Sequence, residues 1–255
     1  MKTAVRINFY IAYSRSDETA ASWLMNVPEL FARRAPGNTC LGALESGKCG
    51  TLENLINHSK GCGGVMRVAP IGLYFNDQDV SIRDIATIGA ETAAITHGHT
   101  LGWMLAASLV QIVHEVSQDD TEIRDAVLHS LDTIRDTWPE TKERESFISL
   151  MTRTVDLADG DADDLDAIHE LGEGWVGDEA LAIAVYCAVR YKDDFDRAII
   201  ASVNHNGDSD STGAIAGNIL GAKLGRAGIP EKYVKDLELK DVILEVADVC
   251  TKTVG

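Results

Sequence analysis

The stretch that decides the fold runs from Thr92 to His114 and reads TAAITHGHTLGWMLAASLVQIVH. It contains no Asp, Glu, Lys or Arg, so it must be either a membrane span or the centre of a soluble core. Its histidines, such as His97, and its Gln111 would find no hydrogen-bond partners in lipid. We therefore predict a pair of buried helices, broken near 97–100, and no membrane span.

The sequence on both sides of this stretch has helical periodicity. Apolar or small residues recur three and four positions apart over 82–93, 101–112 and 123–134, which places them on one face of an amphipathic helix. Further amphipathic stretches cover about 143–157, 178–190, 194–202, 211–226 and 241–252. Alternation from Val5 to Ile11 fits a strand, and a helix nearly as well. Because the chain shows no linker or repeat, we predict one mostly α-helical domain.

The predicted helix over 211–226 carries a glycine at every fourth position, namely Gly213, Gly217, Gly221 and Gly225. Each glycine costs about 1 kcal/mol relative to alanine inside a helix, so a compensating interaction is expected. A face without Cβ atoms lets a neighbouring helix approach closely. We therefore predict that this helix is central and tightly packed.

Composition narrows the class of protein. The 255 residues are 45% hydrophobic and carry 23 basic against 40 acidic side chains, a formal net charge of −17. This balance argues against a nucleic-acid or anionic-membrane binder, because both partners are polyanions. Five cysteines without a Cys-x-x-Cys pair, and an N-terminus without a secretory signal, favour the reducing cytoplasm.

The strongest local signal is Asp208-Ser209-Asp210-Ser211, just before the glycine-rich helix. Two carboxylates two positions apart converge only in a turn that leads into a helix. With the hydroxyl of Ser211 or Thr212 they would form a hard oxygen site for Mg²⁺, Mn²⁺ or Ca²⁺. An EF-hand is disfavoured because its twelfth position would be Ile219. An Asp/Ser helix cap without metal uses the same residues and stays an open alternative.

Three other segments are each weak signals. The glycines of Ser59-Lys60-Gly61-Cys62-Gly63-Gly64 could present backbone N–H groups to a phosphate, or form only a tight loop. His97 and His99 could bind a metal, although a histidine at a helix end is commoner. The glycines around Trp175 could expose its indole to stack on a base, or Trp175 could simply pack at a helix start.

Together these segments resemble the ADP-ribosylglycohydrolase family. The matching text covers, in the family's order and spacing, Arg34–Cys40, Ser59–Pro70, Thr96–His99, Leu171–Leu181 and Asn204–Gly225. The resemblance implies a single-domain, all-α orthogonal helical bundle over 1–255, with a binuclear Mg²⁺ or Mn²⁺ site in a cleft. It also implies a substrate, either an ADP-ribosylated protein or a small ADP-ribosyl compound, that is cleaved at C1 of the distal ribose.

The resemblance also implies roles for individual residues. Asp208, Asp210 and Ser211 match metal ligands, and the two aspartates would serve catalysis through the metal. The matching substrate-binding residues are Ser59, Gly61, Gly63 and Gly64 for the pyrophosphate, His97 for the ADP-ribose and Trp175 for the nucleoside end. Cys62 stands where some members have Asn.

One departure from the family pattern concerns the N-terminus. Family members begin with a Gly-Asp-x-Leu-Gly-like segment and a Thr-Asp-Asp-Thr segment that supplies the other metal ligands, and this sequence has neither. Ser16-Asp17-Glu18-Thr19 imitates the second segment but lies too close to Arg34–Cys40. The chain is therefore interpreted as an N-terminally incomplete domain. Three readings follow: an active hydrolase, an inactive relative that binds ADP-ribose, or a structural relative.

Overall fold

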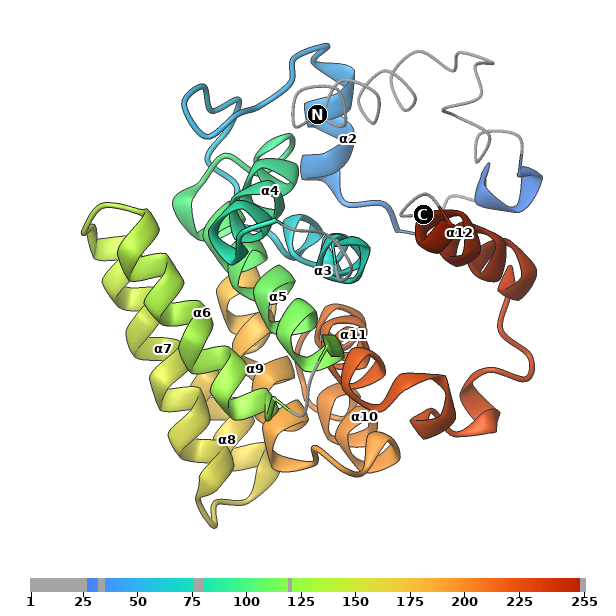
Figure 1. The fold of residues 1–255 in the computed structure, drawn as a ribbon. Helices are drawn as coiled ribbons and strands as arrows, with labels where there is room; N and C mark the ends of the chain where they lie inside the picture. Colours follow the sequence, from blue (N-terminus) through green and yellow to red (C-terminus); the bar gives the residue numbers. More distant parts are fainter. Residues whose placement is uncertain (1–26, 32–34, 76–79, 119–120, 253–255) are drawn as a thin grey trace.

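The fold is seen in a computed structural model that describes residues 27–31, 35–75, 80–118 and 121–252. These residues contain α-helices and short 3-10 helices and no strand, which confirms the all-α prediction (Figure 1). The α-helices are α2 (Asn38–Glu45), α3 (Ala69–Tyr74), α4 (Ile82–Ala94), α5 (Thr100–Gln118), α6 (Ile123–Thr137), α7 (Lys142–Asp159), α8 (Asp164–Leu171), α9 (Gly177–Arg190), α10 (Phe195–Val203), α11 (Ser209–Gly228) and α12 (Lys240–Lys252). The 3-10 helices are η2 (Pro28–Phe31), η3 (Cys62–Gly64) and η4 (Glu231–Tyr233).

The uncharged stretch forms the predicted helix pair. It covers the end of α4 and most of α5, and the break falls between Ala94 and Thr100. Helix α5 is buried along most of its length and packs against α3, α4, α6, α7, α9 and α11. No helix in the described part of the chain is both long and apolar enough to cross a bilayer. The stretch is therefore the centre of the core.

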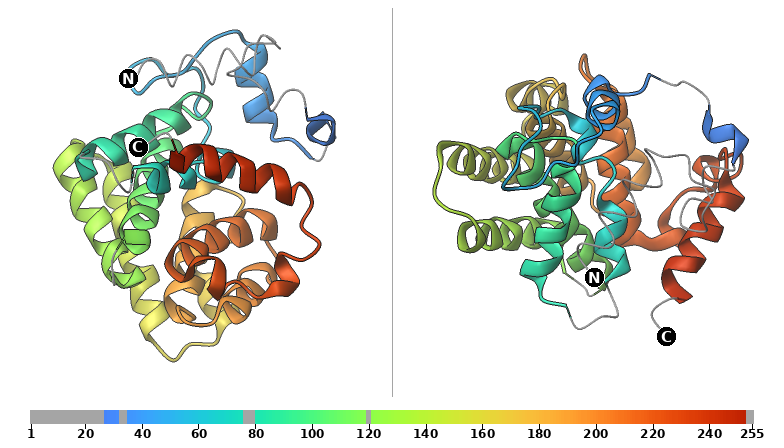
Figure 2. Two further views of the ribbon diagram at one scale, coloured as in Figure 1. Left: turned by 45° about the vertical axis from the view of Figure 1, so that its right-hand side comes forward. Right: turned by 90° about the horizontal axis from the view of Figure 1, so that it is seen from above.

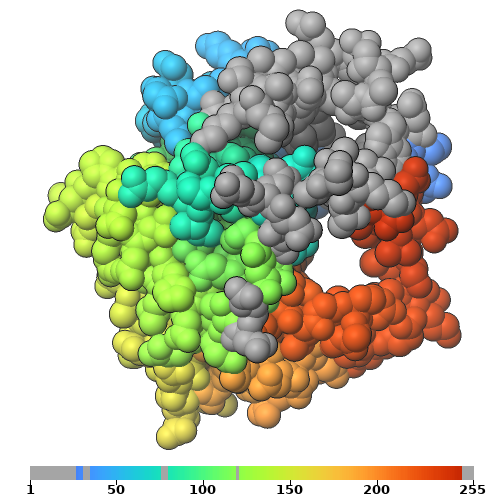
Figure 3. Space-filling view, viewed as in Figure 1, coloured from blue at the N-terminus to red at the C-terminus, as the bar shows by residue number. Residues whose placement is uncertain are grey.

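Helix α9 is the second central element. Its residues from Ala180 to Ala188 are all buried, because the sequence there is apolar nearly all round. It packs against α5, α7, α8, α10 and α11. Figure 2 shows α2 and α12 at the edge of the bundle, away from these two helices. In the space-filling view α6 and α7 form the left flank, and α11 lies at the lower right (Figure 3).

Three short helices, α2, α3 and α8, were not among the predicted elements. Each has eight residues or fewer, too few for a full apolar repeat to stand out from its surroundings. The ambiguous segment from Val5 to Ile11 lies outside the described residues, as does Ser16–Thr19.

The glycines of α11 require a correction. The helix does pack against α5, α9 and α10 as predicted, but its glycines do not form a ridge of close contact. A Cβ at Gly217 or Gly221 would meet its nearest neighbour at an ordinary 3.8 Å. Of the four regularly spaced glycines, only at Gly213 would a Cβ crowd a side chain, at 2.6 Å from Val203 Cγ1. Gly225 instead has φ +63° and kinks the helix.

Candidate functional site

Three loops between helices meet at one place, and they contain three of the four segments singled out from the sequence. We call them the glycine loop (residues 59–64), the tryptophan loop (172–176) and the aspartate loop (204–211). The glycine loop leads into η3, the tryptophan loop joins α8 to α9, and the aspartate loop joins α10 to α11. Their ends are therefore held by the helices that pack on α5 and α9.

The aspartate loop crosses the tryptophan loop backbone to backbone. The N–H of Asp208 donates to the carbonyl oxygen of Glu173 at 2.8 Å. A Cβ at Gly207 would lie 1.7 Å from that same oxygen, so the crossing requires a glycine there. The crossing places Asp208 at the start of α11, in the turn that the sequence predicted.

The two carboxylates of this turn lie together. Ser211 Oγ donates to Asp208 Oδ2 at 2.9 Å, and the side chain of Asp210 is close enough to that of Asp208 for their pKa values to depend on each other. Burial raises the pKa of Asp208, but the hydrogen bonds with Asp210 and Ser211 outweigh it and lower that pKa overall. The same hydrogen bond with Asp208 raises the pKa of Asp210. Asp210 is therefore the first of the pair to take up a proton as the pH falls.

Two sulfur atoms contact this group. Cys62 is buried, and its Sγ lies 3.1 Å from the carbonyl oxygen of Gly174 and 3.6 Å from Asp208 Oδ2. Burial raises the pKa of the Cys62 thiol to about 12, so the thiol keeps its proton and can donate it. Ser211 Oγ also lies 3.3 Å from Met66 Sδ. Met66 is partly buried, packs against the hydrophobic core and contacts Ser211.

The tryptophan loop is shaped by glycine and by one carboxylate. Gly172 and Gly174 have φ values of +127° and +79°, which favour glycine. Glu179 Oε2 accepts hydrogen bonds from the N–H groups of Glu173 and Gly174, both at 3.1 Å. This arrangement leaves Trp175 60% exposed, so its indole is not packed into the core at the helix start.

The glycine loop is held by a hydrogen bond within the loop and by an ion pair with α9. Ser59 Oγ accepts from the N–H of Gly61 at 3.2 Å, and the Lys60 ammonium pairs with Asp178 on α9 at 3.1 Å. A Cβ at Gly64 would lie 2.8 Å from the carbonyl oxygen of Gly102. The loop therefore lies directly against the start of α5.

His97 lies beneath the glycine loop and is 1% exposed. Its ring would be 3.2 Å from a Cβ at Gly63 and 3.5 Å from one at Gly61. Its Nδ1 is 2.8 Å from Thr96 Oγ1, which itself accepts a hydrogen bond from Arg67. We therefore assign the proton of the neutral ring to Nε2. Burial and the nearby Arg67 lower the pKa of His97 to about 4.

His99 has a different role from His97. Its Nδ1 accepts from the N–H of Leu101 at 3.0 Å, so it caps the start of α5. Within the described chain, no three His, Cys, Asp or Glu side chains gather closely enough to hold a metal ion. The possible metal donors of the site are the two carboxylates of Asp208 and Asp210 with the hydroxyl of Ser211. Their hard oxygens suit Mg²⁺ or Mn²⁺ and fill half of a six-coordinate shell.

A cavity of about 220 Å³ opens beside the loop crossing. It is lined by residues of α8 and of the tryptophan and aspartate loops: Leu165, Ile168, His169, Gly172, Glu173, Asn204, His205, Asn206 and Gly207. Neither Asp210 nor the glycine loop contributes to its walls. The cavity is therefore separate from the candidate metal group.

One residue of this region, His205, was missed in the sequence. Its Nδ1 accepts from the N–H of Gly207, and its Nε2 donates to the carbonyl oxygen of Ser202, both at 3.1 Å. These bonds close the aspartate loop. Its place three residues before the Asp-x-Asp pattern was the available signal, but a histidine in a loop has no distinctive spacing.

Comparison with known proteins finds one family over most of the chain. The sequence profile of the family described as ADP-ribosylglycohydrolase matches residues 8–254. An uncharacterized protein of Archaeoglobus fulgidus is 30% identical over 190 residues, which are 73% of this chain and 56% of that protein. ADP-ribosylhydrolase ARH3 of Mus musculus and of Homo sapiens are 26% and 25% identical over 201 residues, 71% of this chain. The chain spans about half the length of these curated relatives.

We predict that Gly207→Ala opens the crossing of the two loops. The added methyl group cannot coexist with the Glu173 oxygen, so the N–H of Asp208 loses its acceptor and the free energy of unfolding falls by about 2 kcal/mol or more. Urea denaturation followed by circular dichroism measures the change. Gly217→Ala on α11 is the matched control, because it meets no close atom and should not lower the stability. Equal stability of the two variants would contradict the tight crossing.

We predict that His97 makes the protein less stable in acid. A folded-state pKa near 4 against 6.5 for the unfolded chain means that the unfolded state binds the extra proton first, so stability is full above pH 6.5 and declines toward pH 4. Between pH 7 and 4.5 this loss is about 2 kcal/mol. Urea titrations at both pH values should show a smaller loss for His97→Asn than for the wild type. The same loss in both proteins would refute the assignment.

Proposed function

The chain belongs to the ADP-ribosylglycohydrolase family, and from this premise we propose that it hydrolyses the bond between C1 of the distal ribose of ADP-ribose and an acceptor group. The acceptor belongs to an ADP-ribosylated protein or a small molecule. The observation that carries the proposal is the meeting of the paired carboxylates of Asp208 and Asp210 with the glycine loop, through Cys62. A metal group and an anion site would then lie side by side.

The glycine loop supports the binding of the diphosphate. Among the described residues, the backbone N–H groups of Gly63 and Gly64 donate no hydrogen bond outside the η3 turn. Donors of this kind on consecutive residues suit the oxygens of a phosphate. Ser59 shapes the loop through its bond with Gly61, and His97 supports it from below. The exposed indole of Trp175, whose Nε1–H donates to Glu173 Oε2 at 3.2 Å, would cover the nucleoside end.

Asp208, Asp210 and Ser211 are the residues that would hold Mg²⁺ or Mn²⁺. The fit rests on the donor set: two carboxylates lie together with the hydroxyl of Ser211, which is 2.9 Å from Asp208 Oδ2, and a bound divalent cation would neutralise the charge of the pair. When bound, such an ion supplies charge stabilisation for the ribose oxygens and lowers the pKa of a bound water. The chain's own contribution is to hold the carboxylate of Asp208 in place, through contacts with the hydroxyl of Ser211 and the thiol of Cys62.

The chemistry of the reaction sets what the site must do. Cleavage at an anomeric carbon passes through an oxocarbenium-like state and needs an oriented water and stabilisation of charge. Binding the diphosphate on the glycine loop would place the distal ribose toward the carboxylates. No residue of the described chain is assigned as the proton-transfer group.

A relative that binds ADP-ribose without cleaving it is the second candidate. It is favoured by one observation: the described site provides two carboxylates and a hydroxyl, and no group of three acidic, His or Cys ligands. That donor set suits one ion better than two. Turnover separates the candidates, because both predict binding.

We predict that Asp208→Asn and Asp210→Asn each weaken Mn²⁺ binding about tenfold or more, because each removes a charged ligand. Asp166→Asn, at an exposed position of α8, is the matched control and should leave binding unchanged. Calorimetric titration with Mn²⁺ and then with ADP-ribose measures both affinities, and release of ADP-ribose from serine- and arginine-linked peptides measures turnover.

The outcomes of this experiment divide the proposals. Binding of both ligands with turnover supports the hydrolase, and binding of ADP-ribose without turnover supports the second candidate. No binding of either ligand by the folded wild-type chain would sink both.

A further inference from the structure

Arg67 lies beneath the glycine loop and is partly buried. Its Nη1 donates to the carbonyl oxygen of Gly63 at 2.6 Å. Its Nη2 donates to the carbonyl oxygen of Thr92 at 3.1 Å and to Thr96 Oγ1 at 2.7 Å. One end of the guanidinium therefore holds the loop, and the other holds the C-terminal end of α4.

The charge of Arg67 is not neutralised by any carboxylate among the described residues. Its other side-chain contact is Cys40 Sγ at 3.6 Å, and its buried Nε has no acceptor within the described chain. The carbonyl groups at the end of α4 offset only part of the charge, because a helix C-terminus carries about half an elementary charge. Burial lowers the pKa of Arg67, but arginine remains protonated in proteins. The glycine loop thus rests on a net positive charge.

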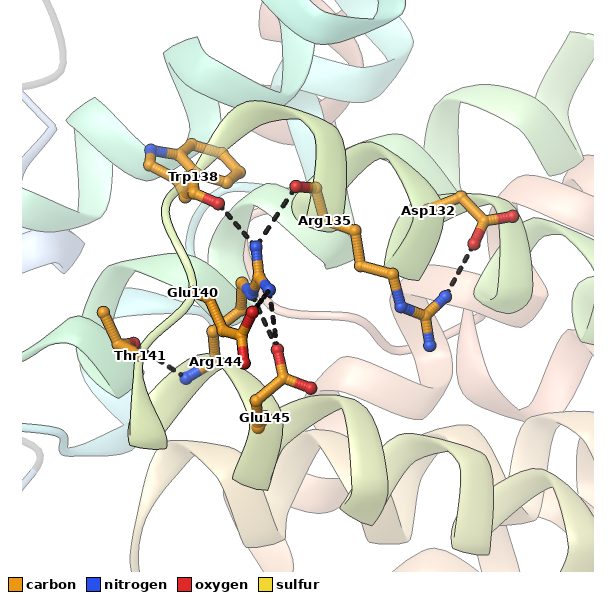
Figure 4. A network of polar contacts seen from close by, with 7 residues as sticks. All are labelled: Asp132, Arg135, Trp138, Glu140, Thr141, Arg144 and Glu145. Atoms are coloured by element: carbon orange, nitrogen blue, oxygen red, sulfur yellow. Dashed lines mark hydrogen bonds and ion pairs between the residues drawn. The ribbon is translucent and has the colours of Figure 1, made fainter.

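Arg144 provides a comparison within the same molecule. Its Nη1 donates to the carbonyl oxygen of Trp138 at 2.7 Å, just after the end of α6. However, its Nη2 lies 2.8 Å from Glu145 and 3.9 Å from Glu140, as Figure 4 shows. A buried arginine that only joins helices is neutralised here, whereas Arg67, which supports the loop, is not.

The bond from Arg67 also orients the loop. In a trans peptide the C=O and N–H groups point in opposite directions. Holding the Gly63 oxygen toward Arg67 therefore turns the N–H of Gly64 away from the guanidinium. Outside the η3 turn that N–H donates to no described group, so it is a candidate donor to an anion. Neutral His97 packs against the same glycines and adds no charge at neutral pH.

We propose that Arg67 is a positioning residue for the diphosphate of the ligand. It orients the amides of the glycine loop and supplies the positive charge that attracts the anion, without touching it. The identity of the ligand rests on the proposed function. The electrostatic part requires only that the loop bind a diphosphate.

Calorimetric titration of the wild type and three variants, with inorganic diphosphate and with ADP-ribose, tests this proposal. Arg67→Met should weaken binding of both probes about tenfold or more and flatten the dependence of affinity on NaCl concentration. Arg67→Lys keeps the charge but not the forked geometry, so it should stay within about threefold of the wild type and retain its salt dependence. Arg144→Met is the matched control, with a lower Tm and unchanged affinities.

The results separate this proposal from the proposed function. Diphosphate binding that depends on the charge at position 67, without ADP-ribose binding, would support the role of Arg67 and reject the function. ADP-ribose binding that survives in Arg67→Met would overturn the role of Arg67 and leave the function standing. A wild type that binds neither probe overturns both. If Arg67→Met does not fold, loss of binding by a folded Arg67→Lys, tenfold or more, overturns the electrostatic role.

Discussion

The close crossing of two backbones, at Glu173 and Gly207, is the constraint on which the candidate site depends. The N–H of Asp208 reaches the Glu173 oxygen only because position 207 has no side chain. The crossing starts α11 with its two carboxylates together and brings Gly174 against Cys62 of the glycine loop. The helices α5 and α9 form a rigid base for these loops because both are buried. The tightly packed core therefore fixes the geometry of the loops at its edge.

Charge is distributed unevenly along this rim. Two carboxylates lie at the start of α11, a partly buried arginine lies under the glycine loop, and the lysine of that loop is already paired with Asp178. A ligand with a diphosphate at one end and hydroxyl groups at the other complements this arrangement, because the hydroxyls can share a cation with the carboxylates. The overall charge of −17 does not reveal this distribution of charge around the site. Only a few of the acidic side chains contribute to it.

The sequence predicted the helices and the turn because both depend on local spacing. The pair formed by α4 and α5 follows from an uncharged stretch with a break, and the convergence of Asp208 and Asp210 follows from glycine and serine before a helix. The contacts that complete the site join distant segments: Cys62 and Asp208 are separated by 146 positions. The role of Glu179 in holding the tryptophan loop, and the reason why Gly207 must be glycine, depend on such contacts and could not be read locally. The prediction from the glycines of α11 was wrong. Their regular spacing indicated a close approach of a neighbouring helix along the whole row, which the structure does not have.

Amide hydrogen exchange, resolved by residue with NMR, tests the account most directly. In the free protein the N–H of Asp208 and that of Gly177, which donates to the Lys60 oxygen at 2.8 Å, should be protected like the helices that flank them. The N–H groups of Gly63 and Gly64 should exchange quickly and become protected when diphosphate or ADP-ribose is added. Fast exchange at Asp208 in the folded protein, or slow exchange at Gly64 without ligand, would contradict the account.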